Sequence, residues 1–165
     1  MEKLLSTDTR MVVLVGLPGM GKTQFAIRIS HLLAEENQSA MFVEKQKTLT
    51  DICSEILYNL CGEDRMTGND DVLQQATRKL SKLQKDIVIV LDNTEDIQEQ
   101  GGFDGFAQTL LASSPKVKLM ITTRRNVKTI SADIHWVHLQ PMDTNSSAEL
   151  LNCRDVLAVC EEYLK

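Results

Sequence analysis

The sequence is poor in several features that would point to other classes of protein. Aromatic residues make up 4% of the 165 residues, so the core must rely on Leu, Ile, Val and Met. Acidic residues outnumber basic ones and the net charge is −5, which argues against a general nucleic-acid-binding protein. No apolar stretch approaches the ~18 residues of a membrane span, and the first residues show no signal-peptide cleavage pattern. We therefore expect a cytoplasmic protein that binds neither nucleic acid nor membrane.

Closely spaced cysteine pairs are also missing. Cys53 and Cys61 are eight residues apart, and Cys153 and Cys160 are seven apart. On helices each pair would share one face, so we expect buried free thiols, with a disulfide or a zinc site as the less favoured alternative.

Apolar, β-branched runs alternate with amphipathic segments along the chain. The runs predict strands at 11–15, 40–44, 87–92, 117–125 and 134–141. Helical spacing of apolar residues predicts helices at 23–36, 49–61, 70–84, 106–113 and 146–165, with polar loops at 61–70 and 95–105. Five strands interleaved with helices predict one domain, an α/β protein with a three-layer α/β/α sandwich.

The stretch GLPGMGKT at 16–23 matches the phosphate-loop pattern G-x-x-x-x-G-K-[ST] at every fixed position. It lies between a predicted buried strand and a predicted helix, where backbone N–H groups and the positive end of the helix can hold phosphates. We expect Lys22 to reach the β- and γ-phosphates and the Thr23 hydroxyl to bind Mg²⁺. The candidate nucleotide contacts here are Gly16, Pro18, Gly19, Met20, Gly21, Lys22, Thr23 and Gln24.

Two later strands end in polar side chains that suit the same site. Asp92 ends the run IVIVLD and is the expected second magnesium ligand. Many P-loop ATPases have an acid next, to polarise the attacking water, but here Asn93 follows, which can orient a water and cannot act as a base. Glu95 and Asp96, which follow in the predicted loop, could reach back toward that water. We expect intact binding with slow or assisted hydrolysis.

The run MITTRR ends the fourth predicted strand with hydroxyls and cations. If this strand lies between the first and third, Thr122 and Thr123 face the γ-phosphate, and Arg124 can sense whether that phosphate is present. Asp92, Asn93 and Arg124 are therefore the candidate catalytic residues, and Thr123 and Arg124 are further candidate nucleotide contacts.

Together, GLPGMGKT, IVIVLDNTED and LMITTRR resemble the NB-ARC domain, the STAND-class P-loop switch of apoptosome proteins and plant resistance receptors. The resemblance covers residues 10–151, including LQPMDTNSSAELL. It implies a parallel sheet of order 2-3-4-1-5, and phosphate binding by Gly19, Gly21, Lys22 and Thr23. It further implies Mg²⁺ held by Thr23 and Asp92, and γ-phosphate sensing by Arg124. The implied activity is an ADP-held off state that exchanges to ATP and oligomerises, in innate immunity or cell death.

The chain departs from that family in what accompanies the sandwich. The helical module and winged-helix module that complete the nucleotide pocket in the family have no room before Lys165. We therefore expect one NB-ARC-like domain over 1–165, as a fragment, a truncated product or a short paralogue. Its candidate partners are further copies of itself in a homo-oligomer, or a longer relative.

Two other functions fit part of this pattern. A small P-loop kinase would need an arginine-rich lid, which does not appear. A non-catalytic modulator would keep the fold and bind a longer relative. Adenine is expected over guanine from the resemblance, since no N-K-x-D stretch is present.

Overall fold

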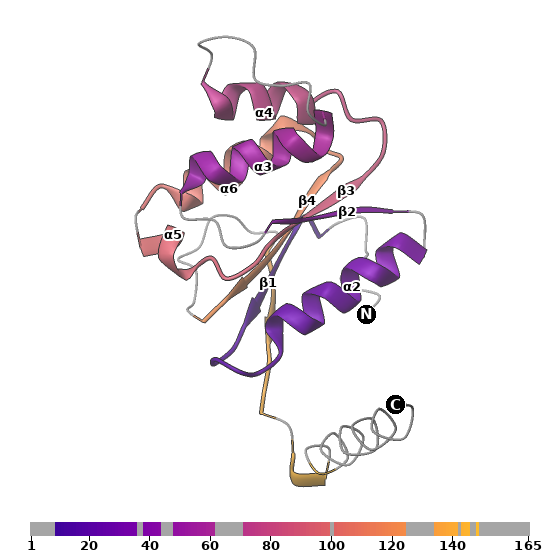
Figure 1. The fold of residues 1–165 in the computed structure, drawn as a ribbon, viewed down its shortest axis with the longest axis vertical. Helices are drawn as coiled ribbons and strands as arrows, with labels where there is room; N and C mark the ends of the chain where they lie inside the picture. Colours follow the sequence, from indigo (N-terminus) through magenta and orange to yellow (C-terminus); the bar gives the residue numbers. More distant parts are fainter. Residues whose placement is uncertain are drawn as a thin grey trace, which may run out of the picture.

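A five-stranded parallel sheet forms the centre of the molecule, with strand order β2-β3-β4-β1-β5 (Figure 1). The structure, a computed structural model, describes residues 9–35, 38–43, 48–61, 71–99, 101–124, 134–141, 143–145 and 148. The predicted class, the parallel pairing and the order 2-3-4-1-5 are confirmed. The strands are β1 (Met11–Val15), β2 (Ser39–Val43), β3 (Ile87–Leu91), β4 (Val117–Thr123) and β5 (Ile134–His138).

Helices cover both faces of the sheet, which gives the three layers expected from the sequence (Figure 1). The continuous apolar runs of β1 and β3 supply side chains to both faces, because successive residues of a strand point in opposite directions. On one face, α2 (Lys22–Glu35) forms a core with alternate residues of β1 and β3. On the other face the larger core is closed by α3 (Leu49–Cys61), α4 (Val72–Leu80) and α6 (Phe103–Ser113).

The register of the strands brings their carboxyl ends to one edge of the sheet. Val15 is paired with Thr123, and Leu91 is paired with Ile121. The P-loop that follows β1 therefore begins beside the end of β4, and the Gly16 N–H donates to the Thr123 carbonyl at 3.3 Å. This edge is where open α/β sheets bind ligands.

The segment 95–105 is not the loop that the sequence predicted. Residues Glu95–Glu99 form the short helix α5, and α6 begins at Phe103 rather than at 106. Acidic residues in the first turn of α5 suit the positive end of a helix, and Ile97 and Phe103 are buried. Apolar anchoring therefore overrides the three glycines, of which Gly102 precedes α6 in a left-handed conformation.

Other boundaries differ by a few residues from those predicted. α4 is shorter than the range 70–84, β4 ends at Thr123 rather than at 125, and β5 ends at His138 rather than at 141. The predicted helix at 146–165 and the predicted loop at 61–70 lie almost wholly outside the described residues. Within the described part of the chain, no helix has the length and apolar character needed to cross a membrane.

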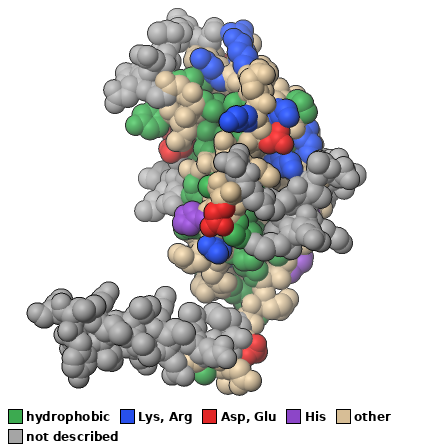
Figure 2. All heavy atoms as spheres, turned by 90° about the vertical axis from the view of Figure 1, so that its right-hand side faces the viewer, with side chains coloured by type: hydrophobic (Ala, Val, Ile, Leu, Met, Phe, Trp, Pro, Cys, Tyr) green, Lys and Arg blue, Asp and Glu red, His purple; other side chains and the backbone are tan. Residues whose placement is uncertain are grey.

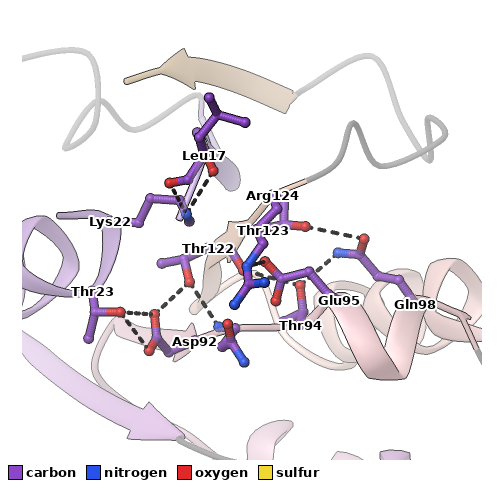
Figure 3. Close-up of polar contacts among 12 residues, drawn as sticks. Leu17, Lys22, Thr23, Asp92, Thr94, Glu95, Gln98, Thr122, Thr123 and Arg124 are labelled. Atoms are coloured by element: carbon purple, nitrogen blue, oxygen red, sulfur yellow. Dashed lines mark hydrogen bonds and ion pairs between the residues drawn. The ribbon is translucent and has the colours of Figure 1, made fainter. Parts of the chain in front are cut away.

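Cationic side chains of the described residues are unevenly distributed. Figure 2 shows Lys and Arg side chains gathering on the upper part of the face it views, around α4 and the segment after it. Along the chain, Arg78 and Lys79 lie in the last turn of α4, and Lys82 and Lys85 lie between α4 and β3. At the opposite edge of the sheet, Lys22 and Arg124 are the cations among the described residues that lie in the site (Figure 3).

Candidate nucleotide-binding site

The P-loop between β1 and α2 adopts a conformation that depends on its glycines. Gly19 and Gly21 have φ angles of 79° and 81°, in the left-handed region that L-residues with a side chain rarely adopt. The carbonyl of Gly21 accepts the first bond of α2, from the Phe25 N–H at 2.8 Å. The loop thus leads directly into a helix N-terminus, whose positive end favours bound phosphate.

Lys22 is folded back onto the P-loop. Its Nζ donates to the carbonyl oxygens of Gly16 at 2.7 Å and Leu17 at 3.0 Å, and the residue is only 9% exposed (Figure 3). These bonds satisfy the ammonium group at the centre of the loop. A phosphate that enters the loop would replace neutral carbonyl acceptors with charged ones, which form stronger hydrogen bonds.

Three side chains from three different elements meet beside the loop. Thr23 on α2 donates to Asp92 at 2.9 Å, and Thr122 on β4 donates to Asp92 Oδ1 at 2.5 Å (Figure 3). Asp92 follows β3, and its own backbone N–H is held by the Val43 carbonyl at 3.1 Å. Hydroxyl and carboxylate oxygens are the ligands that Mg²⁺ prefers, so Thr23 and Asp92 fit the predicted magnesium site.

Asn93 occupies an unusual backbone conformation next to this cluster. Its φ is 58°, which Asn tolerates better than most residues with a side chain. Its N–H donates to the Thr122 hydroxyl at 2.9 Å, and its side chain is exposed. Thr122 therefore links Asp92 and Asn93, so the turn after β3 is fixed to the end of β4.

The end of β4 makes a second set of contacts, with α5. Arg124 Nε lies 3.5 Å from Glu95 Oε1, and Gln98 donates to the Thr94 hydroxyl at 2.6 Å. Thr123 is fully buried, and its hydroxyl lies 3.4 Å from Gln98 Oε1 (Figure 3). Alternation along β4 thus directs Thr122 to Asp92 and Thr123 to α5.

The other residues in and beside the P-loop that were predicted to contact nucleotide differ in their exposure to solvent. Pro18 and Gln24 are exposed, and Met20 is partly buried. A Cβ at Gly16 would lie 3.2 Å from the Met20 sulfur and 3.3 Å from Leu139 Cβ, so the segment after β5 packs closely on the loop.

Sequence reasoning did not identify Gln98 or the burial of Glu95. The i, i+3 spacing of these two residues would place them on one face of a helix, but the segment was predicted as a loop. Arg125 lies outside the described residues.

The sheet order, the P-loop before α2 and the acid at the end of β3 together define the P-loop NTPase architecture. The chain belongs to the NACHT domain family, whose model matches residues 10–156. P-loop NTPase families of this kind generally bind Mg²⁺-nucleotide. The resemblance to the NB-ARC type of STAND P-loop domain is therefore confirmed, and NACHT is the family that the model identifies.

Among curated proteins, the chain is similar to the ToMV resistance protein Tm-2(2) of Solanum lycopersicum. The two are 29% identical over 157 residues, which is 90% of this chain and 17% of that protein. The chain thus spans about one-sixth of the length of this curated relative.

Two solved structures illustrate the shared fold. The Aeropyrum pernix ORC1 protein, solved in complex with DNA, has a TM-score of 0.72 at 18% identity over 87% of this chain and 43% of that one. A STAND protein with a tetratricopeptide repeat sensor from Pyrococcus horikoshii has a TM-score of 0.54 at 20% identity. The match covers 82% of this chain and 21% of that one. Identities this low establish the fold and nothing further.

Proposed function

We propose that this chain is an ADP/ATP-binding switch domain that holds Mg²⁺-nucleotide on its P-loop and hydrolyses ATP slowly or not at all. The observation that carries the proposal is the cluster of Thr23, Asp92 and Thr122. It joins the P-loop helix to the ends of β3 and β4 through hydrogen bonds of 2.5–3.1 Å. Within this cluster, Thr23 and Asp92 are the residues that would hold Mg²⁺.

Slow hydrolysis is supported by the residue that follows Asp92. Asn93 has no group that can accept a proton from water, although its exposed amide could orient one. Magnesium, when bound, would neutralise charge that develops on the phosphates. The protein itself supplies Lys22 and the loop N–H groups, which bind and orient the phosphates.

Sensing of the third phosphate is proposed for Arg124. Its side chain is half exposed, it follows β4 directly, and it shares the carboxyl edge of the sheet with Lys22. A guanidinium at this edge can form paired hydrogen bonds with phosphate oxygens. ADP and ATP would then leave Arg124 in different positions, which is what a switch requires.

The biological setting follows from similarity alone. The relative Tm-2(2) is by its name a virus resistance protein, and the family is of STAND type. We propose a cytoplasmic role in innate-immune or cell-death signalling, with oligomerisation or binding to a longer relative. The nucleotide-binding unit is proposed to span the chain, with its core at residues 10–151.

The first test is to purify the protein without added nucleotide, denature it and identify by chromatography what is released. Calorimetric titration of ADP and ATP with Mg²⁺ follows, on the wild type, on Lys22→Ala and on Lys85→Ala. Lys85 is an exposed lysine at the other end of the sheet, so its variant controls for charge. We expect Lys22→Ala to abolish tight binding and Lys85→Ala to leave it unchanged.

Three results would contradict the proposal. Binding that survives in Lys22→Ala, or no binding of either nucleotide at millimolar concentration, would remove the nucleotide site. The latter would favour the non-catalytic modulator. Rapid transfer of phosphate to an acceptor other than water would favour the kinase.

A further inference from the structure

The carboxylate of Glu95 is buried without a hydrogen bond. The residue is 8% exposed, and no donor among the described residues makes a hydrogen bond to either of its oxygens. Burying a polar group without a hydrogen bond is unfavourable, and burying an unpaired charge is more so. Glu95 therefore depends on a nearby cation to a degree that an exposed glutamate does not.

That cation is Arg124, and the two partners differ in their freedom to move. The Nε–Oε1 distance is 3.5 Å, while the Arg124 side chain is 51% exposed and that of Glu95 is 10% exposed. Glu95 begins α5, and Gln98 on the same helix bonds to Thr94, which in turn bonds to the Thr122 carbonyl at 3.2 Å. Glu95 is thus fixed to the sheet, and Arg124 is the partner that can leave.

We propose that Glu95 competes with the third phosphate of a bound nucleotide for Arg124, and so sets the preference of this site for nucleoside diphosphate over triphosphate. This inference rests on the proposed function. A triphosphate that draws Arg124 away leaves the Glu95 carboxylate buried and unpaired. A diphosphate has no third phosphate to attract Arg124, so the Arg124–Glu95 ion pair stays intact. Glu95 is therefore a specificity-determining residue that acts through Arg124 and need not touch the nucleotide.

The competition predicts opposite effects from the two partners. Glu95→Gln keeps the shape and removes the charge, so it should raise the affinity for triphosphate relative to ADP by about tenfold. Arg124→Ala should lower that ratio, because the phosphate loses its cation. In the Arg124→Ala background, Glu95→Gln should change the ratio less than about twofold, because nothing remains to compete for.

The test is calorimetric titration of ADP and a non-hydrolysable ATP analogue with Mg²⁺. The proteins are the wild type, the two single variants, the double variant and Asp104→Asn. Asp104 is an exposed carboxylate at the start of α6, so its variant removes the same charge away from Arg124. A non-hydrolysable analogue keeps any change in hydrolysis out of the measurement, and circular dichroism checks folding.

The outcomes separate this inference from the proposed function. If neither nucleotide binds to the wild type, the proposed function fails and the inference falls with it. If both bind and Glu95→Gln leaves the ratio unchanged, only the inference is overturned. It is also overturned if the Glu95→Gln effect persists without Arg124, or if Asp104→Asn has the same effect. Should Glu95→Gln not fold, an Arg124→Ala ratio equal to that of the wild type would overturn it alone.

Discussion

Thr23 and Asp92 are 69 residues apart in the sequence, and their side chains are hydrogen-bonded at 2.9 Å. The bond joins the first turn of α2, which follows β1, to the residue after β3, and β4 lies between these two strands in the sheet. It places a hydroxyl and a carboxylate at the point where the P-loop would present phosphates.

Asp92→Asn should make nucleotide binding insensitive to magnesium. The amide is a poorer ligand than a carboxylate for a hard divalent cation. We expect the affinity for ATP in Mg²⁺ to fall at least about tenfold, to the level seen for the wild type in EDTA. Calorimetry in Mg²⁺ and in EDTA measures this, with Asp104→Asn as the control. An Asp92→Asn variant that still responds to Mg²⁺ as the wild type does would exclude Asp92 as a ligand.

Thr122→Val should destabilise the protein, although the side chains of threonine and valine have nearly the same shape. The Thr122 hydroxyl donates to Asp92 and accepts from the Asn93 N–H, and the residue is 1% exposed. Its removal leaves the part-buried Asn93 N–H without its acceptor and Asp92 without one of its donors, for a loss of about 1–3 kcal/mol in the free energy of unfolding. Urea denaturation measures the loss.

The matched control is Thr109→Val on α6, whose hydroxyl is exposed and donates to the Gly105 carbonyl. Its free energy of unfolding should change by less than about 0.5 kcal/mol. Equal effects of the two substitutions would mean that the Thr122 hydroxyl has no special role.

Gly21→Ala and Gly105→Ala should act in opposite directions. An added Cβ meets nothing within 4 Å at either position, so the two differ in backbone conformation alone. Gly21 has a φ of 81°, and an alanine there should lower the free energy of unfolding by about 1–2 kcal/mol and weaken nucleotide binding. Gly105 lies within α6, where an alanine should raise the free energy of unfolding by about 0.5–1 kcal/mol.

Thermal unfolding followed by circular dichroism compares these two variants with the wild type. A Gly21→Ala protein as stable as the wild type would show that the loop relaxes to another conformation, and its nucleotide affinity would then decide whether the observed loop conformation is needed.

Cys53 should resist alkylation in the folded protein even at alkaline pH. Burial, with a smaller contribution from Asp71, raises the pKa of its thiol from 9.0 to about 12. At pH 9 only about 0.1% of Cys53 would be thiolate, the form that reacts, whereas about half would be thiolate in the unfolded chain. The raised pKa also means that Cys53 favours the folded state below pH 9 and that this contribution is lost as pH rises toward 12.

Iodoacetamide labelling at pH 7 and pH 9, mapped by mass spectrometry with and without urea, measures this protection. Cys61 is the internal comparison, because it is only partly buried. Rapid labelling of Cys53 in the folded protein at pH 9 would contradict the burial described.

Much of this molecule was determined by the sequence alone. The phosphate loop, the buried strands and Asp92 are local patterns, because a glycine with positive φ, an apolar run and a strand-terminal acid are each specified by neighbouring residues. The expected strand order came from the resemblance of these segments to the NB-ARC family, and the expected roles of Lys22 and Thr23 came from the phosphate-loop pattern.

The tertiary structure decided which distant groups meet. Arg10 donates to three carbonyls, of Leu111, Ser114 and Val117, at 2.6, 2.6 and 3.0 Å, a contact that no local pattern indicates. Likewise, only the pairing of β3 with β4 directs Thr122 to Asp92, and only the docking of α5 buries Glu95 beside Arg124. Burial and partner depend on packing between segments far apart in the chain, whereas the pattern of each segment depends on its own residues.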